Sequence, residues 1–461
     1  MNWVYQKLSE VKNSHQVFLT FRNKVVSFCE AYQFMCDFHK KLKSEGWKEG
    51  DAFILVAYPD HRVPLLVLAL TAGGFNVLVT DPQSFVVKNV ANQKVNFDAV
   101  IHISDNNQVS IDKNYEIRSE DRVGLIRGAL LVLTSGTTGR PKLVVVSLEA
   151  LLERAIVESM IFQIGKGDRI LNVLGFAHEL GLTQIFSTLL QIASLYIVPA
   201  VFTGQIIKEF EDIEPMGIVA TPFFCENLLF GNLNVKLSHL KWFSISGGMF
   251  SERDDHQIFQ LLRPQRLVRT YGKTETGRSL YNDSQDFSIP HNLGFPVPRV
   301  SLELVKEAHC SNQAGNLAHY GGSLCESKNE DRLSLLGGHL TGDYFLYDTS
   351  KGFYFVGRKD RMVKRFDQRM YLDQIEYELS KVEGVRKAIV ISDDKMNRLG
   401  TSGRIVAFIQ MNEGKDNSGL RLSLAQHLRR PFLPDQIHFV TDWPQTPSLK
   451  IDFDVLARLA N

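Results

Sequence analysis

A short loop rich in hydroxyls, glycines and cations lies in the first third of the chain. Residues 134–142 read Thr-Ser-Gly-Thr-Thr-Gly-Arg-Pro-Lys and stand between two apolar runs. Glycines let a backbone approach an anion closely, while hydroxyls and cations supply further donors. The spacing is not that of a Walker loop. The loop predicts a polyphosphate site, with a polar hairpin tip as the structural alternative. The expected phosphate contacts are Thr134, Ser135, Gly136, Thr137, Thr138, Gly139 and Lys142.

Four later segments carry further groups that suit a nucleotide. Glu275 is a carboxylate on a glycine-bearing loop, and Mg²⁺ prefers oxygen ligands and phosphates. Asp343 can accept hydrogen bonds from both hydroxyls of a ribose. Their structural alternatives are a surface glutamate and a turn aspartate. The segments are Ser246-Gly247-Gly248, Tyr271-Gly272-Lys273-Thr274-Glu275, Thr341-Gly342-Asp343 and Gly357-Arg358-Lys359-Asp360.

Lys450, in Thr446-Pro447-Ser448-Leu449-Lys450, completes a series that resembles the adenylate-forming (ANL) superfamily in the order of its motifs. That superfamily contains acyl- and aryl-CoA synthetases, adenylation domains and luciferases. A lysine ammonium stabilises the charge that develops when a carboxylate attacks the α-phosphorus of ATP. The resemblance implies Mg²⁺ on Glu275 and catalytic roles for Thr274, Glu275 and Lys450. It implies ATP or AMP contacts by the phosphate loop, Gly247, Tyr271, Gly272, Asp343 and Arg358.

A histidine segment resembles part of the acyl pocket of acyl- and aryl-CoA synthetases. Residues 176–182 read Phe-Ala-His-Glu-Leu-Gly-Leu, which matches a His-x-x-Gly-Leu pattern whose histidine borders the acyl group. His178 is therefore a candidate catalytic residue, with a satisfied core histidine as the alternative. Amino-acid adenylation domains place a carboxylate near here to pair with the substrate ammonium, and Glu179 leaves that alternative open. The expected pocket residues are His178, Glu179, Gly248, Gly272 and Lys273.

Asp360 lies where the family has its hinge. The resemblance implies that a small C-terminal domain rotates there between adenylation and attack by a thiol. Two glycines usual in the family are replaced, by Asp367 after the hinge and by Leu449 before Lys450. Glycine often marks close backbone approach or positive φ. The first replacement bears on entry of CoA, and the second on the backbone around Lys450.

Composition narrows the class of protein. The chain has 461 residues, is 44% apolar, and carries a net charge of +1 from 52 basic and 51 acidic residues. That balance argues against a nucleic-acid binder. Five cysteines without a Cys-x-x-Cys pair favour a reducing cytoplasm over a disulfide framework or zinc site. The N-terminus shows no apolar signal region. Residues 63–80 lack charge, but Pro64 and Gly73-Gly74 favour a buried helix, a turn and a strand over a membrane span.

The pattern of apolar runs predicts an α/β fold. Strands near 52–57, 75–79, 99–103 and 128–133 alternate with helices at 64–72 and 148–162, which indicates mostly parallel sheets covered on both faces. Residues 1–357 are expected to form a core of two such sheets that ends in a small β subdomain at 300–357. Residues 358–461 are expected to form a mobile α+β domain, with a hinge near 358–361 in a solvated, charged linker. Asp373 and Glu376 predict a capping box at a helix start.

The leading functional hypothesis is an ATP-dependent carboxylate ligase. It forms an acyl-adenylate, releases pyrophosphate, and transfers the acyl group to a thiol of CoA or of carrier-protein phosphopantetheine. The phosphate loop begins at residue 134, which leaves a short N-terminal part and favours a small, aryl or short-chain acid. One alternative is a free-standing amino-acid adenylating enzyme that loads an acyl or peptidyl carrier protein. The other is a nucleotide-binding paralogue that lacks the thioester step.

Overall fold

The chain folds into two compact units. The computed structural model describes residues 2–56, 60–80, 96–103, 109–113, 126–134, 142–198, 204–230, 237–248, 251–289, 291–306, 314–326, 337–365, 368–392, 404–412, 420, 424, 428, 432–444 and 451–460. Unit 1 comprises Met1–Leu302 with His319–His339, and unit 2 comprises Glu303–Ala318 with Leu340–Asn461. The division into compact units does not show where the chain bends, so the hinge near 358–361 stays a prediction.

Unit 1 contains a six-stranded sheet with the order β6-β5-β3-β4-β7-β8. Its central strands pair in parallel, and β6 and β8 pair antiparallel at the two edges. Alternate residues of β3 enter two different cores, as parallel strands covered on both faces require. The strands are β3 (Ala52–Val56), β4 (Asn76–Thr80), β5 (Ala99–Ile103), β6 (Val109–Asp112), β7 (Leu130–Thr134) and β8 (Lys142–Val146).

A second sheet of unit 1 has the order β15-β14-β13-β12-β11-β9-β10-β1-β2. Its strands from β13 to β1 pair in parallel, whereas β2, β14 and β15 join antiparallel. The strands are β1 (Val17–Phe21), β2 (Lys24–Ser27), β9 (Arg169–Asn172), β10 (Ser194–Ile197), β11 (Gly217–Ala220), β12 (Trp242–Ile245), β13 (Arg266–Lys273), β14 (Gly277–Asn282) and β15 (Asn292–Pro296).

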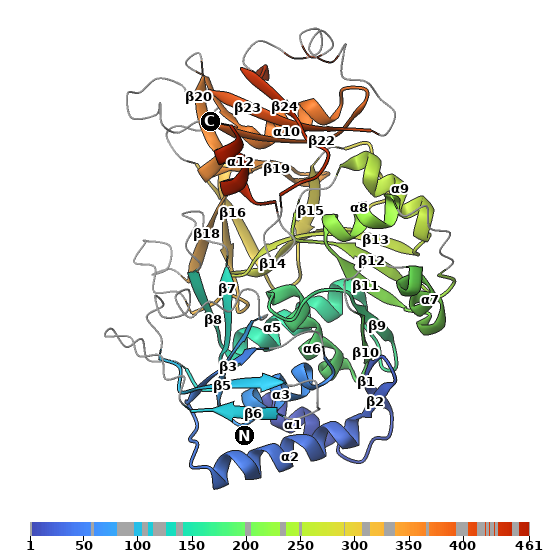
Figure 1. Cartoon of the computed structure of the whole chain (residues 1–461), viewed down its shortest axis with the longest axis vertical. Coiled ribbons are helices and arrows are strands. Elements are labelled where there is room, and N and C mark those ends of the chain that lie inside the picture. The colour runs from blue at the N-terminus through green and yellow to red at the C-terminus, as the bar shows by residue number, and fades with distance from the viewer. Residues whose placement is uncertain are drawn as a thin grey trace. The chain divides into compact units, whose positions relative to one another are not determined.

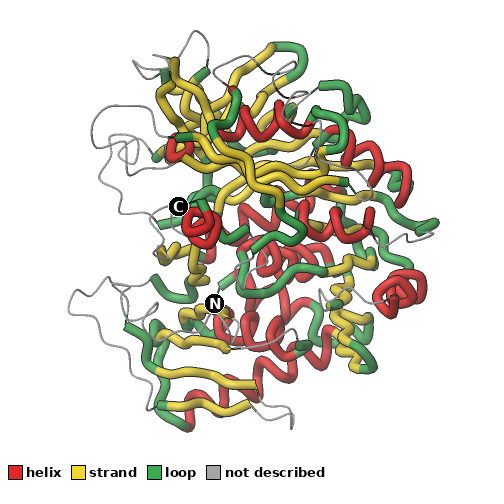
Figure 2. The backbone as a smooth tube through the Cα atoms, turned by 45° about the horizontal axis from the view of Figure 1, so that its top comes forward, coloured by secondary structure: helices red, strands yellow, loops and turns green. Residues whose placement is uncertain are grey.

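The helices of unit 1 share their cores with these sheets. One core joins α1, α2, α3, α5 and α6 to both sheets, and Figure 2 shows strands on either side of this group of helices. A second core lies under α8 and α9. The helices are α1 (Trp3–Glu10), α2 (Phe28–Ser44), α3 (Arg62–Ala72), α5 (Leu148–Phe162), α6 (Glu179–Gln191), α7 (Gly204–Ile213), α8 (Pro222–Phe230) and α9 (Glu252–Leu262) (Figure 1).

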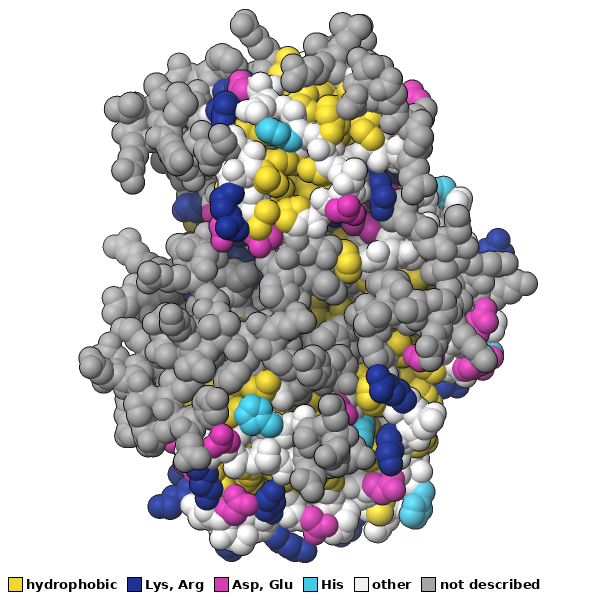
Figure 3. Space-filling view, viewed as in Figure 1, with side chains coloured by type: hydrophobic (Ala, Val, Ile, Leu, Met, Phe, Trp, Pro, Cys, Tyr) yellow, Lys and Arg dark blue, Asp and Glu magenta, His cyan; other side chains and the backbone are white. Residues whose placement is uncertain are grey.

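The uncharged stretch at 63–80 forms α3, a Gly-Gly turn and β4, as the sequence predicts. None of the helices among the described residues has the length and apolar character needed to cross a bilayer. Among the described residues visible in Figure 3, basic and acidic side chains are interspersed. The described cysteines, Cys29, Cys36, Cys225 and Cys325, are free thiols.

Among its described residues, unit 2 combines strands with the short helices α10 (Leu372–Ser380) and α12 (Phe453–Leu459). The strands β16 to β19 follow one another in a single sheet, β20 pairs with β21, and β22-β23-β24 form a separate sheet. Two further cores of unit 2 contain residues of α10 and of α12, each together with β22 and β23. The elements are β16 (Ser301–Val305), β17 (Gly315–Tyr320), β18 (Gly338–Asp348), β19 (Gly352–Arg358), β20 (Met362–Arg365), β21 (Gln368–Tyr371), α10 (Leu372–Ser380), β22 (Val385–Ser392), β23 (Ile405–Met411), β24 (Gln436–Phe439) and α12 (Phe453–Leu459).

The predicted capping box at Asp373 and Glu376 is wrong. Helix α10 begins at Leu372, and both carboxylates accept hydrogen bonds from Arg361, whose Nη1 lies 2.6 Å from Asp373 Oδ1 and 3.1 Å from Glu376 Oε2. Within the expected solvated linker, Lys359 and Asp360 are exposed, whereas the Arg361 side chain is largely buried, at 16% exposed. A buried guanidinium needs carboxylate partners, and this need outweighs local capping.

Candidate functional site

The predicted phosphate loop joins two paired strands. Thr134 ends β7 and Lys142 begins β8, and the two residues are direct antiparallel partners. Thr134 Oγ1 donates to the Lys142 carbonyl at 3.4 Å. The strands therefore fix both ends of the loop. Ser135, Gly136, Thr137, Thr138 and Gly139 lie outside the described residues, as do Asp367, Leu449 and Lys450, so their roles stay predictions.

A rigid turn carries Thr274 and Glu275 between β13 and β14. Thr276 is fully buried, and its hydroxyl donates to the Gly277 carbonyl at 2.9 Å and accepts from the Lys273 N–H at 3.2 Å. A Cβ on Gly272 would lie 2.3 Å from the Gly277 carbonyl oxygen. Only glycine fits this close approach, which explains its presence after Tyr271.

Glu275 has the surroundings expected of a metal-binding carboxylate. Its carbonyl accepts from the Cys325 N–H at 2.8 Å, which ties down the backbone. Within the described part of the chain, no hydrogen bond or ion pair engages the half-exposed carboxylate. No cluster of three His, Cys, Asp or Glu side chains occurs among those residues either. Mg²⁺ commonly takes one or two carboxylates and completes its shell with phosphates and water, so a single fixed glutamate fits.

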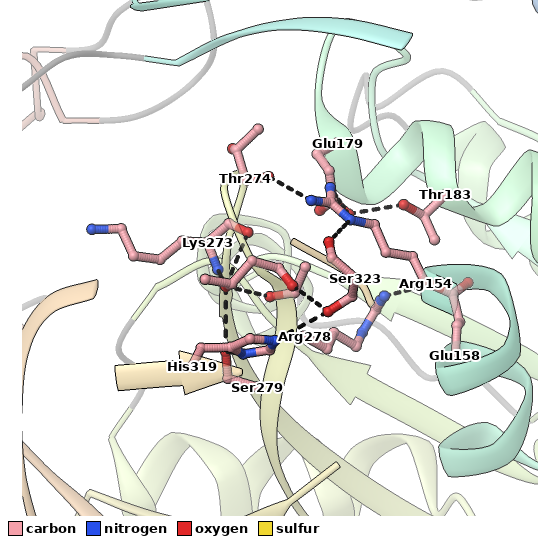
Figure 4. Close-up of polar contacts among 12 residues, drawn as sticks. Arg154, Glu158, Glu179, Thr183, Lys273, Thr274, Arg278, Ser279, His319 and Ser323 are labelled. Carbon is pink, nitrogen blue, oxygen red and sulfur yellow. Dashed lines mark hydrogen bonds and ion pairs between the residues drawn. The ribbon is translucent and has the colours of Figure 1, made fainter. Parts of the chain in front are cut away.

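A buried polar ladder lies between α5 and α6, beneath this turn (Figure 4). Arg154 Nη1 donates to Glu179 Oε1 at 3.2 Å, and Thr183 donates to the same oxygen at 2.9 Å. One turn further along α5, Glu158 accepts from Ser187 at 2.8 Å and also from Arg278. Burial raises the pKa of Glu158, and Arg278 opposes this effect.

No sequence motif links the members of this ladder, although their spacing carries a signal. Arg154 and Glu158 are four residues apart in an apolar helix, as are Glu179, Thr183 and Ser187 in the next. Polar residues at that spacing share one face of each helix. The two helices α5 and α6 therefore carry matching polar faces, which identifies a pairing that neither helix reveals alone.

A neutral histidine supports the same turn. His319 is fully buried, with Nδ1 2.9 Å from Ser279 Oγ and Nε2 3.1 Å from Ser323 Oγ. Ser323 in turn donates to the Thr276 carbonyl at 2.8 Å. Burial, followed by the charge of Arg154, lowers the pKa of His319 to about 3, so the ring is neutral. Ser279 lies 40 residues from His319, and Ser323 lies 47 residues from Thr276, so no local spacing links His319 and Ser323 to the turn.

Two of the predicted acyl-pocket residues, His178 and Glu179, lie at the start of α6. His178 is the extended residue before the helix, and Glu179 is its first, buried residue. Gly247 has φ +83°, and a Cβ there would lie 3.4 Å from Leu180 Cδ1, which brings the Gly-Gly segment beside α6. Lys273 extends away from the Arg154 cluster in Figure 4.

A cavity of about 30 Å³ lies beside Gly248 and is large enough for about one or two water molecules. Asp255 and Arg269 border it, with Oδ2 and Nη1 3.5 Å apart. Burial raises the pKa of Asp255 to about 7 against the opposing charge of Arg269. The other lining residues are Ile245, Gly248, Glu252, Thr270, His291, Asn292 and Leu293.

Unit 2 contains the predicted ribose contact and hinge. Asp343 is 7% exposed on β18 and lies directly across from Arg358 on β19. Arg358 donates from Nε and Nη2 to the carboxylate of Asp360, at 3.0 and 2.6 Å. The predicted second nucleotide contact is thus paired with the predicted hinge residue.

Comparison with known proteins identifies the family. The sequence profile of AMP-binding enzymes matches residues 51–327, more than half of the chain. The chain belongs to this family. The family resemblance and the enzyme class predicted from sequence are confirmed. The match covers the phosphate loop, the α6 segment and the Glu275 turn, and it ends before Asp343 and Arg358.

Curated relatives of this AMP-binding enzyme are distant. The Anguibactin system regulator of Vibrio anguillarum is 26% identical over 76% of the chain, which spans 36% of that protein's length. The L-proline–[L-prolyl-carrier protein] ligase of Streptomyces coelicolor is 26% identical over 70% of the chain and 65% of its own length.

Solved structures confirm the predicted α/β fold. ATP-bound MatB from Rhodopseudomonas palustris superimposes with a TM-score of 0.85 at 17% identity, covering 100% of this AMP-binding enzyme and 99% of MatB. The O-succinylbenzoate Coenzyme A synthetase (MenE) of Bacillus subtilis, in complex with ATP and magnesium ion, gives 0.80 at 16% identity, covering 98% of both chains. ATP and magnesium therefore occur in structural neighbours of this fold.

Proposed function

We propose that this chain is an ATP-dependent carboxylate ligase. The carboxylate of a small acid attacks the α-phosphorus of ATP, pyrophosphate leaves, and an acyl-adenylate forms. A thiol of CoA or of carrier-protein phosphopantetheine then attacks the acyl carbon, and AMP leaves. The observation that carries the proposal is the Glu275 turn, which presents a carboxylate on a backbone fixed by Thr276 and Cys325.

The predicted residues supply the contacts that this reaction needs. Residues 134–142 contact the phosphates, Tyr271 stacks on the adenine, and Asp343 and Arg358 bind the nucleotide. Lys450 stabilises the charge that develops on the phosphoryl and carboxylate oxygens. Mg²⁺ neutralises phosphate charge, and Glu275 is the residue that would hold it. Support comes from the family match and from neighbours solved with ATP and magnesium.

A hinge at Asp360 separates the two half-reactions in this proposal. Residues 1–357 form the adenylating core, and residues 358–461 rotate so that the thiol reaches the acyl-adenylate. Support comes from Arg361, whose guanidinium also donates to the Val390 carbonyl at 2.8 Å. Because Arg361 is anchored to α10 and β22, the residues just before it must absorb any rotation.

A second candidate is an amino-acid adenylating enzyme that loads a carrier protein. The named Streptomyces relative acts on L-proline and a carrier protein, and Glu179 stands at the start of the α6 segment. Glu179 Oε1 already accepts hydrogen bonds from Arg154 and Thr183, which would fix the carboxylate for an incoming ammonium. The first curated relatives are much longer than this chain, so its acceptor is a proposal in either case.

Exchange of labelled pyrophosphate into ATP over a library of aryl, fatty and amino acids tests both candidates. Exchange with one class of acid supports adenylation and identifies the substrate class. Exchange with amino acids only, lost in Glu179→Gln but kept in the control Glu158→Gln, selects the carrier-loading enzyme. A folded, ATP-binding preparation that exchanges with no acid would overturn the ligase proposal in favour of the paralogue without chemistry.

A further inference from the structure

One buried arginine joins three separate segments of unit 1. The Arg154 side chain is 2% exposed, and each of its nitrogens has a different partner. Nε donates to the Ser323 carbonyl at 2.9 Å, Nη1 to Glu179 at 3.2 Å, and Nη2 to the Thr274 carbonyl at 3.0 Å (Figure 4). A single rigid group on α5 thus contacts α6, the β13–β14 turn and the 321–326 segment.

The contact at Thr274 fixes the turn at its outer end. Thr276 and the Cys325 N–H hold the turn from below, through the Lys273 N–H and the Glu275 carbonyl. Arg154 adds a bond to the carbonyl immediately before Glu275. The direction of the Glu275 carboxylate depends on this backbone, so Arg154 acts on that carboxylate without touching it.

The geometry requires an arginine. The guanidinium fork directs its donors along fixed, diverging directions, whereas lysine has one nitrogen on a flexible stem. A lysine at this position can pair with Glu179 but cannot reach the Thr274 and Ser323 carbonyls at the same time. Replacing Arg154 with lysine therefore removes the contact with the turn but keeps the ion pair with Glu179.

We infer that Arg154 is a positioning residue that sets the Thr274–Glu275 turn against the start of α6. It thereby couples the acid-binding segment to the carboxylate that holds Mg²⁺. The inference rests on the proposed function for its consequence in catalysis, but the contacts themselves are independent of it. Residues that orient a metal ligand typically change metal affinity or activity by about 10- to 100-fold when they are replaced.

Hydrogen–deuterium exchange of the full-length protein, without substrate, tests the contact. In Arg154→Met and Arg154→Lys, the amides of Lys273 and Thr276 should exchange at least about tenfold faster than in the wild type. The control is Glu158→Gln, which alters a buried carboxylate one turn along the same helix that has no hydrogen bond to the turn. It should lower global stability without this local change.

The Mg²⁺ requirement of pyrophosphate exchange tests the consequence. Arg154→Lys should need roughly tenfold more Mg²⁺ for half-maximal rate, with KM for the acid also raised, while Glu158→Gln keeps the wild-type requirement. Turn exchange in Arg154→Lys equal to that in Glu158→Gln overturns the inference. If the wild type lacks pyrophosphate exchange with every acid, the proposed function fails, and the hydrogen-exchange result still decides the role of Arg154.

Discussion

Arg358 holds the carboxylate of Asp360 with two hydrogen bonds, from Nε at 3.0 Å and from Nη2 at 2.6 Å. The proposed function gives Arg358 to the nucleotide and Asp360 to the hinge. The nucleotide and the Asp360 carboxylate therefore compete for the Arg358 guanidinium. Burial lowers the pKa of Arg358, but its hydrogen bonds to Asp360 and the nearby charges of Asp360 and Asp343 raise the pKa overall, so the guanidinium stays charged.

Asp360→Ala should strengthen AMP binding, because Arg358 no longer has to leave an internal partner. Both side chains are partly exposed, so the pair contributes no more than about 1 kcal/mol, and AMP affinity should rise by up to roughly fivefold. Calorimetric titration with AMP measures the change. Asp348→Ala, which removes an exposed aspartate at the end of β18, should leave AMP binding as in the wild type. Weaker or unchanged binding in Asp360→Ala contradicts the competition.

Arg361→Met should destabilise the protein by about 3–5 kcal/mol, since it leaves Asp373 and Glu376 buried without a counter-charge. Urea unfolding followed by circular dichroism measures the loss. Arg299→Met, which breaks an exposed pair with Glu153, should leave stability nearly unchanged. Adding Asp373→Asn and Glu376→Gln to Arg361→Met should recover part of the stability. A loss no larger than that of Arg299→Met would show that the buried cluster contributes little.

Local patterns predict several elements of the fold. Helix α5 has the limits expected from its apolar spacing because Ser147 caps its first turn and Gln163 ends it with φ +54°. The apolar runs become the strands of the sheets because covered parallel strands must be apolar on both faces. The same runs fix both ends of the predicted phosphate loop.

Local sequence patterns do not predict the long-range polar contacts. Asp373 and Glu376 have the spacing of a local cap, but Arg361, twelve residues before Asp373, takes both carboxylates. Arg154 and Thr274 are 120 residues apart, so no local spacing links them. The candidate site therefore follows from motifs, whereas the groups that hold it in place emerge only when the chain is folded.

Asp255→Asn should stabilise the protein more at pH 8 than at pH 5. The pKa of Asp255 is raised to about 7 by burial, from an ordinary 3.8, so the folded state keeps a proton that the unfolded chain has lost. Stability contributed by this group therefore falls as pH rises through that window, and asparagine cannot ionise. The difference in unfolding free energy between variant and wild type should grow by roughly 2–3 kcal/mol from pH 5 to pH 8.

Urea unfolding at both pH values measures the effect of Asp255→Asn. Asp37→Asn is the matched control, because hydrogen bonds from Gln33 and Lys40 lower the pKa of Asp37 and place its titration below this range. Its difference from the wild type should be the same at pH 5 and pH 8. If the difference in unfolding free energy between Asp255→Asn and the wild type is also the same at both pH values, Arg269 keeps Asp255 ionised in the folded state.

Lys450→Ala should reduce pyrophosphate exchange by at least about 10²-fold while thermal unfolding stays unchanged, because it removes a group that acts on transition-state charge. AMP binding should persist, since the other proposed nucleotide contacts remain. Lys381→Ala, an exposed lysine paired with Glu378 in unit 2, serves as the control and should retain full exchange. Full activity in Lys450→Ala would remove this lysine from the mechanism.

Asp367→Gly should leave adenylation unchanged and speed the second step, since Asp367 replaces a family glycine on the proposed path of the thiol. A gain of about tenfold in transfer corresponds to about 1.4 kcal/mol of barrier. Single-turnover transfer from preformed acyl-adenylate to CoA and to a carrier protein measures it. Asp367→Ala separates two causes, because alanine removes the carboxylate without the positive-φ freedom of glycine. Faster transfer in both variants identifies the side chain as the obstruction, faster transfer in Asp367→Gly alone identifies the backbone, and no change in either rejects the idea that Asp367 narrows the path.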